Sequence, residues 1–122
     1  MSTIKVDSIQ ATDETASRAV SGVAAAWCSF DTTGTVATIG SFNVSSLSDV
    51  ATGQTALNLS SAFAAVDYAS SADNKAQSTA ATYRGGLNYE GCTTSLLNYR
   101  CGTSSGYVDS NYNAITVHGD LA

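Results

Sequence analysis

Along most of the chain, apolar and polar side chains alternate with the period of two that is typical of a half-buried β-strand. In AAWCSF, at 25–30, the even-numbered side chains share one face and Trp27 lies with Ser29 on the other. In NYNAITVHG, at 111–119, the odd-numbered side chains from 113 to 117 share a face. The other segments with strand-like alternation are TVATIG, SFNVSSL (with Phe42 and Val44 on its buried face), TALNLS, FAAVDYASS and TSLLNYRC. Strands about ten residues apart predict an antiparallel sandwich or a small barrel.

Short polar stretches that contain glycine separate these segments and predict turns. DTTG, which ends at Gly34, begins with an aspartate that can accept a hydrogen bond from the backbone ahead. ATGQ around Gly53 and the stretch GTSSG predict two more turns, and the pair Gly85–Gly86 predicts a loop or hairpin turn. The alanine-rich pieces SRAVSGVAAAW and DNKAQSTAATY leave one short helix open by propensity. An all-β body is nevertheless favoured.

The first 22 residues differ from the rest of the chain. They are rich in charge, and Ile4, Val6 and Ile9 are the main apolar residues before the pair Ser21–Gly22, which suits a hinge. Twenty residues with so few apolar groups cannot form a core. We therefore expect an N-terminal attachment or trimerisation arm at 1–22, followed by a β-sandwich domain at 23–122. The opening MSTIKVDSIQ lacks the apolar stretch of a secretory signal, so synthesis in a cytoplasm without signal-directed export is expected.

Composition narrows the classes of partner. Charged residues make up 12% of the chain, whereas 18 serines and 15 threonines supply more than a quarter of it. The formal net charge is −5 and the five basic residues do not cluster, which argues against nucleic acid as a partner. No apolar run approaches the roughly 20 residues of a membrane-spanning helix, so membrane insertion is not expected.

The residues that usually perform catalysis are sparse. His118 is the only histidine, and its position at a strand end favours a structural interpretation over a catalytic triad. Nothing in the sequence pairs Glu90 with Asp109 as a glycosidase would require. The stretch SADN offers oxygen ligands without the spacing of a calcium loop. We therefore expect no enzymatic activity, no metal and no cofactor.

The chain has three cysteines, Cys28, Cys92 and Cys101. An odd number of cysteines argues against a full disulfide framework. A bridge between Cys92 and Cys101 across a hairpin is one alternative. Buried or half-buried free thiols are favoured, because chains made in a reducing cytoplasm rarely keep disulfides.

Sugar binding is the chemistry that the sequence supports best. Five of the six tyrosines lie between 83 and 112, with asparagine and arginine interleaved. Tyrosine rings stack on the apolar faces of sugars, while amide and guanidinium groups bond to the hydroxyls. The predicted ligand-binding residues flank the glycine pair: Tyr83, Arg84, Asn88 and Tyr89. The alternatives are that these tyrosines fill the core or that the region is a trimer interface.

The stretch from Ala25 to Ala69 resembles a domain of tail-fibre-like proteins of marine and cyanobacterial phages. The positions that carry the resemblance are Trp27, Phe30, Gly34, Thr35, Val36, 41–46, Thr52, Gly53, Leu57, Leu59, Phe63 and Tyr68. The opening STIKVDSIQ and the ending SSGYVDSNYNAITVHG are also similar to parts of such appendage proteins. The chain departs from the family at 38–40, where charged residues are usual, and 70–92 has no counterpart in it.

The resemblance implies a non-enzymatic virion protein of a phage, located in a tail appendage and assembled as a homotrimer. With the strand pattern, it leads us to expect a jelly-roll-like antiparallel β-sandwich. The arm would attach to other tail or baseplate proteins, and the distal domain would bind a host cell-surface polysaccharide, with three weak sites adding avidity. The alternative is a structural adaptor or decoration protein of the tail, baseplate or capsid that meets no receptor.

Overall fold

The computed structural model describes residues 8–9, 18–19, 24–75 and 83–122. The expectations for Ile4 and Val6, for a hinge at Ser21–Gly22 and for most of the helix-prone stretch before Tyr83 lie outside these residues. Within the described part the protein is all-β, with one turn of 3-10 helix, η1 (Tyr89–Gly91), and no α-helix. The all-β expectation is therefore confirmed.

Two short strands near the N-terminus, β1 (Ser8–Ile9) and β2 (Arg18–Ala19), pair antiparallel with each other. The strands of the main body, in chain order, are β3 (Ala24–Asp31), β4 (Ala37–Phe42), β5 (Val44–Ala51), β6 (Gln54–Leu59), β7 (Ala69–Asn74), β8 (Arg84–Leu87), β9 (Leu96–Thr103), β10 (Gly106–Tyr107) and β11 (Asn113–His118).

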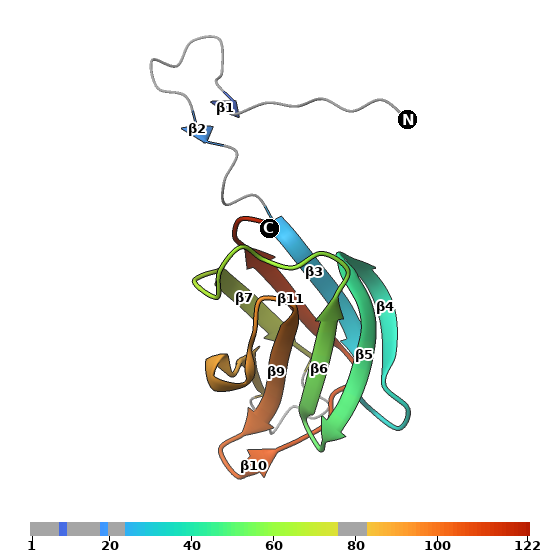
Figure 1. The fold of residues 1–122 in the computed structure, drawn as a ribbon. Coiled ribbons are helices and arrows are strands. Elements are labelled where there is room, and N and C mark those ends of the chain that lie inside the picture. Colours follow the sequence, from blue (N-terminus) through green and yellow to red (C-terminus); the bar gives the residue numbers. More distant parts are fainter. Residues whose placement is uncertain (1–7, 10–17, 20–23, 76–82) are drawn as a thin grey trace.

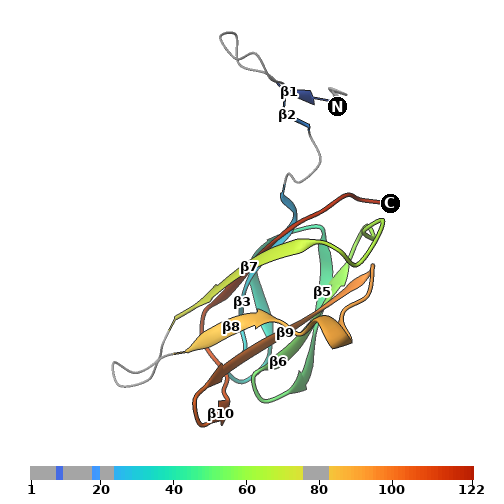
Figure 2. The same cartoon turned by 90° about the vertical axis from the view of Figure 1, so that its left-hand side faces the viewer.

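These strands form two antiparallel sheets that fit a β-sandwich (Figure 1). Within the described residues, one sheet has four strands in the order β4-β3-β11-β7, and the other has the order β10-β9-β6-β5 with β8 also paired to β9. Gly102 of β9 lies opposite Arg84 of β8 and opposite Tyr107 of β10, so β8 and β10 flank β9 on different edges. Figure 2 shows β8 and β9 side by side, with β10 at their lower end.

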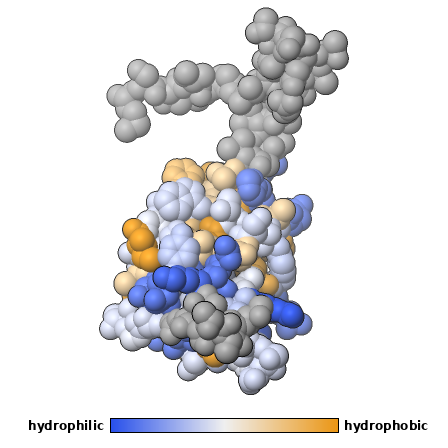
Figure 3. Space-filling model, turned by 180° about the vertical axis from the view of Figure 1, so that it is seen from behind, coloured by the Kyte–Doolittle hydropathy of each residue, from blue (hydrophilic) through white to orange (hydrophobic). Residues whose placement is uncertain are grey.

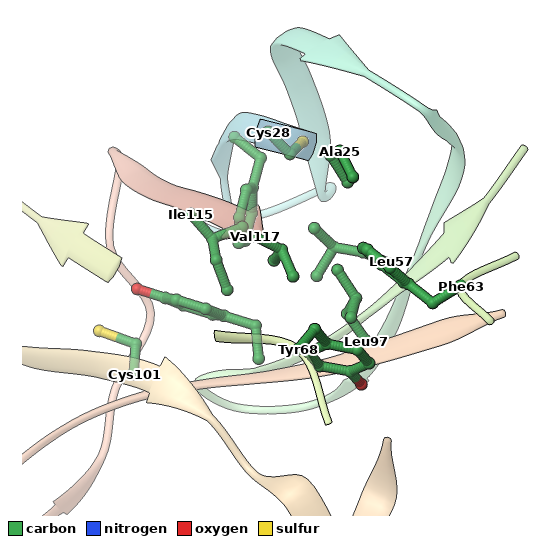
Figure 4. Close-up of a cluster of buried hydrophobic side chains, with 12 residues drawn as sticks. Ala25, Cys28, Leu57, Phe63, Tyr68, Leu97, Cys101, Ile115 and Val117 are labelled. Carbon is green, nitrogen blue, oxygen red and sulfur yellow. The ribbon is translucent and has the colours of Figure 1, made fainter. Parts of the chain in front are cut away.

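The core lies between the sheets and follows the predicted alternation. The even-numbered residues of β3 from 26 to 30 and the odd-numbered residues of β11 are buried, as expected. Leu57 and Leu97 from the five-stranded sheet meet Ile115 and Val117 from the four-stranded one (Figure 4). Each such side chain contributes about 1.5–3 kcal/mol when removed from water, which makes this contact the main source of stability.

The chain passes from one sheet to the other at Asn43, which separates β4 from β5. This residue has a φ of 58°, a conformation that asparagine tolerates better than most residues. Its Nδ2 donates to Ala25 O at 3.1 Å and to Ser61 O at 3.0 Å, and its Oδ1 accepts from Ser61 N at 2.7 Å. The predicted continuous strand through SFNVSSL is therefore wrong. Phe42, expected on a buried face, is 53% exposed because the chain changes sheet directly after it.

Two further predictions meet different outcomes. The DTTG turn is confirmed: Asp31 Oδ1 accepts from Thr33 N at 2.7 Å, and Gly34 has a φ of 75°. A strand through Val66 is wrong, since Val66 is 52% exposed in a connection and the strand begins only at Ala69.

A buried hydrogen-bond network joins the two sheets at the end of the core. The Tyr99 hydroxyl from β9 donates to Asn113 Oδ1 in β11 at 3.2 Å. Asn113 Nδ2 in turn donates to Ser110 O at 3.0 Å, and Thr32 Oγ1 accepts from Ser110 N at 2.9 Å. The ring of Tyr99 packs edge-on against Phe30, with centroids 5.1 Å apart. Burial raises the pKa of the Tyr99 hydroxyl, so it remains protonated and keeps its role as donor.

Replacing Asn113 by alanine is expected to lower the free energy of unfolding by about 3 kcal/mol, because several buried partners lose their hydrogen bonds together. Urea unfolding measures the effect. Asn58→Ala is the matched control, since Asn58 lies on a strand but its side-chain bonds to Ser46 and Ser48 are exposed, and less than about 1 kcal/mol is expected. Equal effects of the two variants would contradict a special role for the buried network.

Candidate functional site

The candidate site lies on the outer face of the five-stranded sheet, where β8, β9 and β10 meet. The strand register places Arg84, Arg100 and Tyr107 on this face, together with Gly86 and Gly102. Gly102 lies between Arg84 and Tyr107 on neighbouring strands, and Gly86 lies opposite Arg100. The open backbone among the three larger residues is that of Gly86, whereas a Cβ on Gly102 would lie 3.0 Å from Gly106 O. A Cβ on Gly86 would meet no atom within 4 Å.

Arg100 and Tyr107 hold each other in place. Arg100 Nη1 donates to the Tyr107 hydroxyl at 3.0 Å, and the guanidinium carbon lies 5.4 Å from the centre of the tyrosine ring. The ring is 49% exposed despite this contact. Arg100 Nε is buried without a hydrogen-bond partner, as is Asn98 Oδ1 on the same face of β9. Both atoms are covered by the protein, so the exposed hydrogen-bonding groups of this face lie elsewhere.

Neutral polar side chains continue this face toward the other edge of the sheet. Gln54 lies opposite Arg100, and Asn58 lies further along β6 on the same face of the sheet. Asn58 Nδ2 donates to Ser46 Oγ at 3.1 Å and approaches Ser48 Oγ at 3.4 Å. The face therefore presents amide, hydroxyl, guanidinium and phenol groups on a rigid backbone.

The structure separates the four predicted ligand-binding residues. Tyr83 and Arg84 lie at the start of β8, whereas Asn88 and Tyr89 follow its end, about 13 Å further along an extended chain. Of the first pair, Arg84 is exposed, and Tyr83 is half-buried and packs against the core. Arg84 thus belongs to the candidate site and Tyr83 supports it from within.

Asn88 and Tyr89 make contacts that stabilise the end of the sandwich. The backbone of Asn88 donates to Asn98 O at 2.8 Å and accepts from Gly91 N at 3.0 Å. The ring of Tyr89 stacks on Tyr68 with centroids 6.1 Å apart, and its hydroxyl lies 3.2 Å from Ser70 Oγ. Tyr89 is still 52% exposed, so its outer ring face remains accessible.

Arg100 and Tyr107 are the site residues that the sequence analysis did not select. Arg100 lies two residues before the predicted turn at GTSSG and Tyr107 lies one residue after it, and a hairpin brings such residues together. The missing step was the register, which a sequence does not give when the loop length is ambiguous.

The groups that could perform covalent chemistry are dispersed. His118 ends β11 and is half-buried, and Asp120 lies on the exposed segment after it. All three cysteines are free, and burial raises the pKa of Cys28 to about 11, so its thiol is protonated and a poor nucleophile near neutral pH. Among the described residues, no group of three or more histidine, cysteine, aspartate or glutamate side chains could hold a metal ion.

Comparison with known proteins gives no relative. No protein-family model matches the chain, and no curated protein or solved structure matches it either. Across the parts that the structure describes, no helix is long and apolar enough to cross a membrane. The chain is thus defined by its class, an all-β protein with two antiparallel sheets.

The pair Gly85–Gly86 lies within β8, so the prediction of a loop or turn there is wrong. Gly85 faces the core, where an added Cβ would overlap the Tyr99 hydroxyl and lie 2.8 Å from the ring carbon that bears it. The glycine is needed for close packing and not for turning the chain.

Gly85→Ala is therefore expected to lower the free energy of unfolding by about 2–3 kcal/mol, because the methyl group forces Tyr99 to move. Gly86→Ala is the matched control on the open face and is expected to change stability by less than about 1 kcal/mol. Thermal unfolding compares the two, and a repeat in a Tyr99→Phe background should shrink the effect of Gly85→Ala. A control variant as damaging as Gly85→Ala would argue against the collision.

Proposed function

We propose that this protein binds a bacterial cell-surface glycan reversibly and without covalent chemistry, as an attachment protein in a phage tail appendage. The observation that supports this most strongly is the polar outer face of the five-stranded sheet. Its exposed Tyr107 ring offers a stacking surface, and Gln54, Asn58 and Arg100 offer hydrogen bonds beside it. Sugars are bound by this combination of one flat apolar surface and many polar groups.

The proposed attachment role also accounts for assembly. A single shallow face binds a sugar weakly, since little surface is buried and polar groups must lose water. A homotrimer, held through the arm at 1–22 and joined by it to other tail or baseplate proteins, would present three copies of the face to one cell surface. Weak contacts then combine through effective concentration.

Tyr107→Ala is expected to weaken oligosaccharide binding about tenfold, which corresponds to about 1.4 kcal/mol, because the stacking surface is lost. Titration of the isotope-labelled protein with a panel of bacterial oligosaccharides, followed by amide chemical shifts, detects binding even at millimolar affinity. Tyr112→Ala is the control, because Tyr112 is 41% exposed and precedes β11 in the other sheet. No shifts with any oligosaccharide, or shifts confined to the four-stranded sheet, would count against the proposal.

A second candidate function is that of a structural adaptor or decoration protein, and a different surface favours it. Strand β4 ends the four-stranded sheet and carries no charge or proline, the usual protection of an edge strand. Trp27 and Phe42 lie opposite each other across β3 and β4, and with Ile39 they are between 41% and 60% exposed. Seen from behind, single hydrophobic residues stand among pale and hydrophilic ones without a broad apolar area (Figure 3). Such an edge suits pairing with a strand of another protein better than it suits a large hydrophobic interface.

If this edge supports assembly, the double variant Trp27→Ser with Phe42→Ser should lower the mass of the full chain in solution toward the 12.4 kDa of one copy. Light scattering after size-exclusion chromatography measures it. Val66→Ser removes a similarly exposed apolar side chain elsewhere and should leave the mass unchanged. An unaltered mass in the double variant would remove this edge from consideration as the contact between copies.

A further inference from the structure

We infer that the glycan bound by this protein carries an anionic group, a carboxylate or a phosphate, which Arg84 and Arg100 hold above Gly86. This inference rests on the proposed function and adds the chemical class of the ligand. It follows from the juxtaposition of two guanidinium groups on open backbone.

The register brings the two arginines within reach of one small anion. Arg84 lies opposite Gly102 and Arg100 lies opposite Gly86, so the arginines are diagonal neighbours on β8 and β9. Diagonal neighbours on a sheet face stand about 7–8 Å apart, which long side chains span easily. Two planar guanidinium forks that converge on a carboxylate or a phosphate form the charge-assisted pairs for which arginine is best suited.

The surroundings leave space for that anion. On β8 and β9 no side chain lies opposite either arginine, because Gly102 lies opposite Arg84 and Gly86 lies opposite Arg100. A Cβ at Gly86 would meet nothing within 4 Å, whereas the neighbouring Gly85 is packed tightly against Tyr99. The open glycine is thus on the ligand side of β8 and the crowded one on the core side.

One arginine is held ready for the ligand. Arg100 donates through Nη1 to the Tyr107 hydroxyl, which fixes the plane of its guanidinium and directs it toward β10. Ordering a free arginine on binding costs about 0.5–1.5 kcal/mol, so an arginine that is already held loses less. Tyr107 then serves both as a stacking surface for the sugar and as the support of Arg100.

Most of the negative charge of the chain acts only weakly on this site. The formal net charge is −5, but charges beyond about 10 Å are largely screened at 0.1 M salt. Asp109 accepts from Gly53 N at 2.7 Å, and the next residue, Gln54, lies opposite Arg100, so one carboxylate lies on the β6 side of Arg100. Arg84 lies across β9 from it, on β8.

Matched sugars test the inference on the full chain. A galacturonic acid hexamer and its methyl ester share one backbone and differ in the carboxylates, and a phosphorylated mannan is compared with plain mannan in the same way. The acidic sugar of at least one pair is expected to bind at least about tenfold more tightly than its neutral partner, with affinity falling as salt rises from about 25 to 300 mM. The two pairs distinguish a carboxylate source from a phosphate source.

Arg84→Gln is the key variant, because Arg84 is exposed at a strand end and its loss should leave the fold intact. It is expected to lower the ratio of acidic-sugar affinity to neutral-sugar affinity about tenfold. Arg100→Gln should do the same, and Arg100→Lys should recover it only in part, since lysine lacks the planar fork. Arg18→Gln is the control, as it removes one positive charge on β2, which pairs with β1 and belongs to neither sheet of the main body.

The outcomes separate the inference from the function on which it rests. Acid-selective binding that Arg84→Gln abolishes supports both. Binding of acidic and neutral sugars with equal affinity overturns the inference and leaves glycan recognition standing. Acid selectivity that Arg18→Gln reduces as much as Arg84→Gln also overturns it, because long-range charge would then explain the preference. Absence of binding to every sugar, acidic or neutral, overturns both.

Discussion

The hydrogen bond from the Tyr99 hydroxyl to Asn113 is the interaction on which the arrangement of the two sheets depends. It connects β9 with β11 through the interior, at the end of the core where apolar contacts give way to polar ones. Hydrophobic contacts have no direction, so they would allow the sheets to slide. A buried donor and acceptor that must meet permit only one alignment, because leaving either unpaired costs about 1–3 kcal/mol.

This constraint extends to the surface through Tyr99's neighbours in the strand. Tyr99 points inward, and its successor Arg100 must therefore point outward on the candidate site. The same ring excludes any side chain at Gly85, which keeps β8 close to β9 and sets Gly86 opposite Arg100. The geometry of the outer face is thus a consequence of how the core is closed.

The strand pattern could be predicted because alternation reports directly on burial. The facing of β3 and β11 is confirmed, and so is the turn at DTTG, where Asp31 bonds the backbone as its chemistry suggests. The wrong predictions concern single residues whose role is set by tertiary contacts. Asn43 turns the chain between sheets, and Gly85 makes room for a ring that is 14 residues away in sequence. Neither role leaves a local pattern in the sequence.

The candidate site was predictable only in part for a related reason. Arg84 was selected for its place beside a glycine pair, but the interpretation of that pair as a turn placed it with Tyr83 and Tyr89. In the structure the pair is a strand, so Arg84 faces Gly102 and joins Arg100 and Tyr107 instead. Tyrosine, arginine and asparagine do share one face, although it does not include the tyrosines first chosen.

A rigid sheet face suits reversible attachment better than a loop would. Loops lose conformational freedom when they bind, and the loss lowers affinity at each site. Here β8, β9 and β10 hold the arginines and the tyrosine on hydrogen-bonded backbone, so little ordering remains to be done. In the proposed role, rapid release would follow from the small contact, and repeated copies would supply persistence. An attachment protein needs both properties, since it must sample a cell surface before it stays there.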